Sequence, residues 1–294
     1  MLRHLFFLLL GFYSQWAYAT LPIQHWQAAS GARVFFIESR DLPILDVSVD
    51  FGAGSSTDTP DKSGRAAMAL HLVNLGAGGL TEDQITKGFA DVGAQLGAHF
   101  DQDRAGITLR TLSSARERSR ALELFGKVIQ HPEFPEYVLE REKARVIAGL
   151  KEADTKPGNI ADRSLMKMLY GTHPYGLRGS GEIESVSKLG RQDLVDFHRF
   201  RYTAGDAVVS IMGDVSRDEA AAIAESLTRD LSRERRGQSI PEVTPPAQGT
   251  QRIAHPATRV ISSSPIPGSN AMIPIIFLSS WVITSLAEAD SPHA

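Results

Sequence analysis

The sequence predicts an α+β fold in which helices pack on a mostly antiparallel sheet. Segments with strand-like alternation and segments with helical periodicity arrive in mixed clusters, without the strict alternation typical of a parallel sheet. Two alternating segments, 95–101 and 105–111, are separated by a short polar stretch and predict a hairpin that turns near Gln102 and Asp103. With 42% hydrophobic residues among 294, the chain can bury a substantial core.

The first part of the chain predicts two strands and then helices. In order, we expect strands at 34–37 and 45–51, a loop from Gly52 to Lys62, a helix at 65–75 that stops at Gly76, and a tight turn between two helices over 76–79. Thr81 and Gln84 have the spacing of a capping box, in which each side chain bonds the backbone N–H of the other. This pair predicts the start of the next helix.

The second part predicts mainly long helices. They are expected at 114–129, 135–153, 159–170 and 193–201, followed by a buried strand at 207–212. Ser216 and Glu219 form a second capping box, which predicts a helix that runs to about residue 231.

The two ends of the chain differ from its middle. Residues 1–19 combine an early Arg3, a short apolar run and small residues before position 20, so they predict a secretory signal and export to the periplasm. The α+β domain is expected over 20–235, a polar linker with several prolines over 236–258, and an atypical apolar tail over 259–294. We expect this tail to pack poorly. A C-terminal membrane anchor is the alternative, opposed by Pro274 and the short apolar run.

Composition excludes several classes of function. A net charge of -3 provides no general attraction to nucleic acid or to an anionic membrane surface, so peptides or small molecules are the expected partners. The chain has 0 cysteines, which excludes a cysteine nucleophile, a cysteine zinc site and disulfides. A G-x-S-x-G nucleophile elbow is also absent from the sequence.

Several segments together resemble the pitrilysin/insulinase (inverzincin) family of zinc peptidases. They are Phe51-Gly52-Ala53-Gly54-Ser55, the segment from Gly64 to Gly76, Leu109-Arg110-Thr111-Leu112, His173-Pro174-Tyr175-Gly176 and the segment from Val209 to Val215. The resemblance covers about 34–256. It implies an α+β half-subunit, a division between two sequence families near Gly190, and a fold in which two such domains clasp a peptide chamber.

Active members of that family carry an inverted H-x-x-E-H motif on the helix that corresponds to 65–75. Two histidines one turn apart hold the zinc, and the glutamate takes a proton from zinc-bound water. Aligning the flanking glycines places Ala67 at the first histidine, Leu70 at the glutamate and His71 at the second histidine. His71 is therefore the only metal-ligand position of the motif that survives.

The third zinc ligand of the family is an acidic residue on a later helix, and that position is altered as well. The segment from Val146 to Pro157 resembles this helix, and its expected acidic pair falls on Ala148 and Gly149. Glu152 lies about one turn further along and faces a neighbouring patch. We therefore expect no catalytic residue and no zinc on this chain, with His71 as a packed or surface histidine.

The resemblance implies a non-catalytic subunit of an exported zinc metallopeptidase. Such a subunit supports peptide binding and cleavage by an H-x-x-E-H partner, which carries the zinc. Two alternatives stay open: an autonomous zinc metalloendopeptidase with displaced ligands, such as His71 with Glu152, and a periplasmic peptide-binding or assembly module.

The end of the chain and the predicted hairpin each carry one further feature. After Thr258 the family would continue into an entire second domain, and the loss of pattern there predicts a truncated or frame-altered product. His99, Asp101 and Asp103 alternate onto one face of the predicted hairpin and could bind a cation, although outward polar residues near a turn are ordinary.

Overall fold

The computed structural model describes residues 21–237, 239–244 and 251–254. The predicted signal and the predicted tail lie outside these residues, and the described parts of the linker contain no helix or strand.

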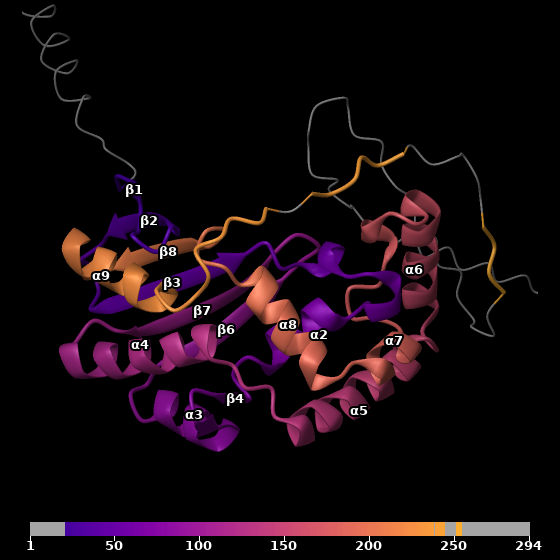
Figure 1. The fold of residues 1–294 in the computed structure, drawn as a ribbon, viewed down its shortest axis with the longest axis horizontal. Coiled ribbons are helices and arrows are strands. Elements are labelled where there is room, and N and C mark those ends of the chain that lie inside the picture. The colour runs from indigo at the N-terminus through magenta and orange to yellow at the C-terminus, as the bar shows by residue number, and fades with distance from the viewer. Residues whose placement is uncertain (1–20, 238, 245–250, 255–294) are drawn as a thin grey trace, which may run out of the picture.

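One mixed sheet of six strands organises the described chain (Figure 1). Its strands follow the order β1 (Gln24–Gln27), β2 (Arg33–Glu38), β8 (Val208–Gly213), β3 (Ile44–Phe51), β7 (Ala105–Leu112) and β6 (Gln95–Phe100). The pair β2 and β8 is parallel, and the other four neighbouring pairs are antiparallel. The predicted α+β class and the mostly antiparallel sheet are confirmed.

Helices cover one face of this sheet. Strand β3 alternates between buried and partly exposed residues along its whole length, and its buried residues, such as Val47 and Val49, join the hydrophobic core. Helix α9 (Arg217–Thr228) contacts β2, and α2 (Arg65–Leu72) and α4 (Ala115–Gln130) contact β7. Alternation with period two thus gives β3 one apolar face and one polar face.

The remaining helices lie beside this core. They are α3 (Glu82–Ala90), α5 (Glu136–Ala153), α6 (Pro157–Tyr170), α7 (Ile183–Lys188) and α8 (Arg191–Arg201). Figure 1 shows α5, α6 and α7 grouped at one end of the molecule, away from β1 and α9. None of the helices in the described part of the chain has both the length and the apolar character needed to span a bilayer.

Both predicted capping boxes are present. Thr81 and Gln84 start α3, and Ser216 and Glu219 start α9, each with the reciprocal side-chain and backbone hydrogen bonds of this motif. The predicted hairpin is also present as β6 and β7, which pair from Phe100 and Ala105 at the turn.

The segment around Gly76 differs from the prediction. The helix ends at Leu72 and not at 75, and residues 76–79 are not a simple turn between two helices. Gly76–Ala77 and Leu80–Thr81 pair as a small hairpin, β4 and β5, around two glycines with positive φ. The Cβ of any other residue at Gly76 would lie 2.7 Å from the Pro135 ring, so close packing against the start of α5 determines this backbone.

Candidate functional site

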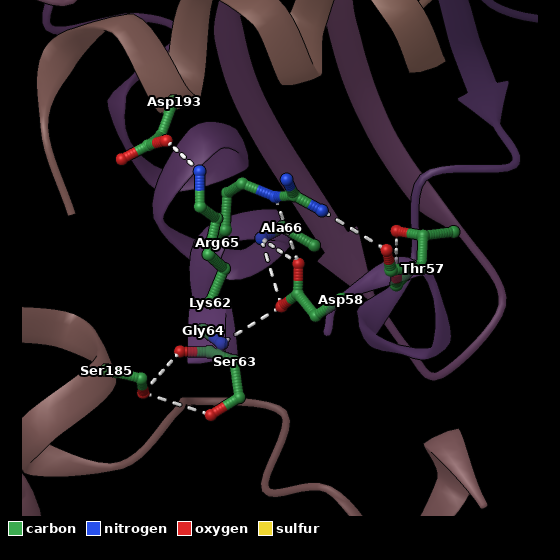
Figure 2. A network of polar contacts seen from close by, with 10 residues as sticks. Thr57, Asp58, Lys62, Ser63, Gly64, Arg65, Ala66, Ser185 and Asp193 are labelled. Atoms are coloured by element: carbon green, nitrogen blue, oxygen red, sulfur yellow. Dashed lines mark hydrogen bonds and ion pairs between the residues drawn. The ribbon is translucent and has the colours of Figure 1, made fainter. Parts of the chain in front are cut away.

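Helix α2 is fixed at its N-terminus by a buried aspartate (Figure 2). Asp58 accepts hydrogen bonds from the backbone N–H of Gly64 at 2.9 Å and of Ala66 at 3.2 Å. These N–H groups have no partner within the helix, and a carboxylate is favourable at the positive end of the helix dipole. Asp58 lies six residues before the N-cap residue Gly64 and caps the helix in its place, because glycine has no side chain to do so.

The charge of Asp58 is balanced locally. The guanidinium of Arg65 lies 3.4 Å from its carboxylate and also donates to the carbonyl oxygen of Thr57. Burial raises the pKa of Asp58 to about 6, against the lowering effects of the Ala66 N–H, of Arg65 and of the Gly64 N–H. Figure 2 shows these contacts converging on the first turn of α2.

Two further contacts hold this turn against the later part of the chain. Lys62 forms an ion pair with Asp193 of α8, and Ser63 Oγ lies 3.0 Å from Ser185 Oγ of α7. Gly64 adopts a φ of 89°, and a Cβ there would lie 2.8 Å from the Cα of Gly181. Only glycine suits such a close approach with left-handed backbone. Helix α2, which corresponds to the zinc-binding helix of the family, is therefore held in place by contacts from both sides of its first turn.

The three motif positions on α2 meet different surroundings. Ala67 is half-buried, Leu70 is 6% exposed and belongs to the hydrophobic core, and His71 is exposed near the end of the helix. Leu70 occupies the position at which active family members carry the general base. It packs against apolar neighbours and has no group that can accept a proton.

His71 is bound to a carboxylate that the sequence analysis did not single out. Its Nε2 lies 3.0 Å from Oε2 of Glu142, on α5. The side chain of His71 is 54% exposed, whereas that of Glu142 is only 4% exposed. His71 was expected to be a packed or surface histidine, and the structure shows a surface histidine that covers a buried carboxylate.

Glu142 is also bound by two arginines. Its Oε1 accepts from Arg141 Nε at 2.6 Å and from Arg145 Nη1 at 2.9 Å, and Arg141 in turn reaches Glu82 at 2.7 Å. Burial alone would raise the pKa of Glu142, but hydrogen bonds from His71 and Arg141 and the charge of Arg145 outweigh it, so this pKa is lowered. Glu142 is therefore an anion whose oxygens are already occupied.

The positions of the missing acidic ligand lie on the same helix. Ala148 and Gly149 are both exposed, and a Cβ at Gly149 would meet no atom within 4 Å. Glu152, the displaced-ligand candidate, is exposed and bound to Lys156 at 2.7 Å. The structure therefore pairs His71 with Glu142, and Glu152 with Lys156.

This site does not suit a catalytic zinc. Such a zinc needs about three protein ligands and an open position for water. Among residues 21–237, 239–244 and 251–254, no group of three or more His, Cys, Asp or Glu side chains could hold a metal ion. His71 and Glu142 supply two donors that bind each other, and no general base stands beside them.

The three side chains of the second candidate cation site each bind a different partner. His99 pairs with Asp50 of β3, Asp101 binds Arg104 at 3.0 Å, and Asp103 accepts a hydrogen bond from the hydroxyl of Tyr175 at 2.8 Å. His99 and Asp103 thus hold the β6–β7 hairpin to its surroundings, and Asp101 closes its turn, as is ordinary for polar residues in such a place.

Glu142 is the site residue that the sequence analysis missed. Its spacing offered a signal, because it precedes Gly149 by seven residues, about two helical turns, and so shares one face of α5 with it. A search of this face for acidic residues, instead of only the expected pair, would have found it.

The fold and site together resemble a metallopeptidase scaffold of helices on a mixed sheet, with Ala67 and Leu70 at two positions of its zinc motif. Residues 33–180 match the family model for Insulinase (Peptidase family M16), and residues 188–279 match the model for the Peptidase M16 inactive domain. The chain belongs to the M16 peptidase family. The second model reaches beyond Thr258, into the segment where the sequence analysis placed an atypical tail. Strand β8, within its range, lies between β2 and β3, so both matched segments build one sheet.

Known proteins resemble this chain over its described domain. A crystal structure of the peptidase M16 inactive domain from Pseudomonas fluorescens has 36% sequence identity and a TM-score of 0.79, covering 81% of this chain and 58% of its own. Cytochrome b-c1 complex subunit 1 of Rattus norvegicus is 22% identical over 208 residues, which is 71% of this chain and 43% of the relative. The uncharacterized zinc protease YmxG of Bacillus subtilis is 23% identical over 66% of this chain and 47% of the relative. The chain thus spans less than half the length of these two curated relatives.

Proposed function

We propose that this chain is a non-catalytic subunit of an exported zinc metallopeptidase. In this proposal it supports peptide binding and cleavage by a partner that carries H-x-x-E-H and the zinc. The observation that carries the proposal is the concerted loss of chemistry on an intact frame. Leu70 stands at the base position, Ala67 and Gly149 lack ligand atoms, and Glu142 binds His71.

The contrast between the frame and the site supports a retained scaffold role. Asp58, Gly64 and Lys62 hold helix α2 in place by buried hydrogen bonds, close backbone packing and an ion pair. A chain with no use for this helix would need none of these contacts beyond what stability requires. One relative is named as a subunit of a complex and another as a zinc protease, which agrees with a family of both subunits and enzymes.

The proposal is tested with an unfolded peptide substrate. The purified chain is assayed alone, and again with an H-x-x-E-H member of the family from the same organism. We expect no cleavage by the chain alone and chelator-sensitive cleavage by the mixture that exceeds the partner's own rate. Chelator-sensitive cleavage by the chain alone would refute the proposal.

The same experiment separates the alternatives that the sequence left open. Stoichiometric zinc in the isolated chain, lost in the variant His71→Ala, would support the autonomous peptidase. Peptide binding by the chain alone, with no cleavage in any mixture, would support a peptide-binding or assembly module. The second result excludes the proposed subunit role, and the first excludes it when the isolated chain also cleaves the peptide.

A further inference from the structure

A polar hollow lies at one end of the sheet, apart from the motif positions on α2. It has a volume of about 300 Å³ and is formed where strands β2 and β8 begin, where β3 ends and where the β6–β7 hairpin turns. Neither His71 nor Glu142 lines it. Its charged residues are the arginines Arg33, Arg104, Arg201 and Arg235 and the aspartates Asp50, Asp103 and Asp206.

The aspartates of this hollow are already hydrogen-bonded. Asp206 accepts from the backbone N–H of Arg236 at 2.8 Å and of Gly237 at 3.1 Å. The other two accept from neighbouring side chains: Asp50 from Ser48 and His99, and Asp103 from the hydroxyl of Tyr175. These bonds direct the carboxylate oxygens to other donors, so the aspartates contribute negative charge to the hollow but form no direct hydrogen bond or ion pair with Arg33 or Arg201.

Two of the arginines have few direct polar partners. Within the described residues the guanidinium of Arg33 makes no hydrogen bond or ion pair, and that of Arg201 donates one hydrogen bond, to the carbonyl oxygen of Gly237 at 3.2 Å. Arg235 is exposed, and its Nε lies 3.9 Å from Asp206. Only Arg104 has a carboxylate partner at hydrogen-bond distance, since it binds Asp101.

Arg201 is held in a fixed place. Its guanidinium lies 5.1 Å from the centre of the Phe200 ring, and Arg236 stacks against the same ring at 4.2 Å. Burial and the positive charge of Arg65 lower the pKa of Arg201, while the charges of Asp206 and Asp58 oppose this effect, so its cationic form is only partly compensated. A guanidinium in this position gains most from an anion that replaces its lost solvent.

We propose that this hollow is a binding site for a small oxyanion, a carboxylate or a phosphate group. Arg33 and Arg201 hold the anion, and Arg235 adds charge at the mouth. A guanidinium presents a planar fork of N–H donors that matches two oxygens of either group. The inference does not rest on the proposed function, because it needs neither a partner nor the zinc-helix position.

The test uses calorimetric titration of the purified chain with inorganic phosphate and with acetylglycine, which carries a peptide-like carboxylate. We expect saturable binding of at least one anion. Arg33→Gln should weaken it roughly tenfold, because it removes a charge-assisted donor. Arg201→Lys should weaken it as well, because lysine keeps the charge but loses the fork. Arg116→Gln, an exposed arginine of α4 away from the hollow, is the control for loss of charge.

The outcomes are separable. Tighter binding of acetylglycine than of phosphate assigns the site to a peptide carboxylate, and the reverse order assigns it to free phosphate. Thermal unfolding with and without the anion shows that each variant is folded, and Arg33→Gln, at an exposed position, keeps the test valid if Arg201→Lys is unstable. Absence of saturable binding, or equal weakening by Arg33→Gln and Arg116→Gln, overturns the proposal.

Discussion

Acid should destabilise this protein through one buried histidine. His198 of α8 is 8% exposed, and its Nε2 donates to the carbonyl oxygen of Ile129 at 2.9 Å. Its ring lies against Tyr202 at 4.7 Å and Phe134 at 6.1 Å between centroids. Burial lowers the pKa of His198 to about 4, opposed by the Ile129 carbonyl and aided by the charge of His131.

The sign and size of the effect follow from this pKa. The unfolded chain has the ordinary histidine pKa of about 6.5 and therefore binds the proton more tightly than the folded chain. The stability contributed by the neutral ring is fully present above that value and is lost as the pH falls from about 6.5 to about 4. Linkage gives a loss of about 2 kcal/mol at pH 5 relative to pH 7.

The perturbation is His198→Gln. The amide Nε2 of glutamine can donate to the Ile129 carbonyl but does not titrate, so the variant should keep the contact and lose the pH dependence. Urea unfolding, followed by tryptophan fluorescence at pH 7 and pH 5, measures both proteins. We expect the wild-type chain to lose about 2 kcal/mol more than the variant between these two conditions. Other carboxylates titrate equally in both proteins and cancel in the comparison.

The matched control is His25→Gln, which changes an exposed histidine of β1. It should leave the pH dependence of wild type unchanged. Parallel stability curves for wild type and His198→Gln between pH 7 and pH 5 would refute the reasoning, because they would mean that folding does not shift the proton affinity of His198.

Three further predictions concern the zinc-helix position and its frame. Glu142→Gln should lower the free energy of unfolding by about 1–3 kcal/mol, because it uncouples a buried acceptor from its cations. His71→Ala, at a half-exposed partner, should cost less than about 1 kcal/mol. Urea unfolding that ranks the two variants in the reverse order would contradict the network. Gly64→Ala should destabilise the protein by about 2 kcal/mol or more, because of the positive φ and the backbone clash at this position. Gly149→Ala, exposed within α5, should stabilise it by up to about 1 kcal/mol. Equal effects of the two variants in thermal or urea unfolding would count against the packing described. The double variant Ala67→His with Gly149→Glu should bind one zinc ion, measured by elemental analysis, but should cleave no peptide, because it restores ligands without a general base. Cleavage by this variant would show that the base is supplied elsewhere.

Sequence patterns were reliable where the determining interactions are local. Thr81 and Gln84 bond to each other's backbone within one turn, so the capping box could be read from a spacing of three residues. The alternation of β3 likewise reports a face that is buried and a face that is not. The segment at Gly76 was mispredicted because its backbone is set by Pro135, nearly sixty residues later.

The candidate site divides in the same way. The chemistry that two motif positions cannot supply could be read directly, because Ala67 and Leu70 lack the atoms that bind zinc or accept a proton, whatever their surroundings. What replaces that chemistry could not be read, because the pairing of His71 with Glu142 joins residues 71 positions apart. Seven-residue spacing marks the shared face of α5 but does not say which residue of that face meets α2.

By itself, the sequence determined the family frame and the side chains at the motif positions of α2, because residue identity fixes which chemistry a side chain can carry. It also determined most helices and strands, because their capping and periodicity are local. Only the tertiary structure decided the insertion of β8 beside β2 in parallel, the burial of Glu142 among cations and the gathering of arginines at the end of the sheet. These features depend on contacts between distant segments, where packing and charge, not sequence distance, select the partner.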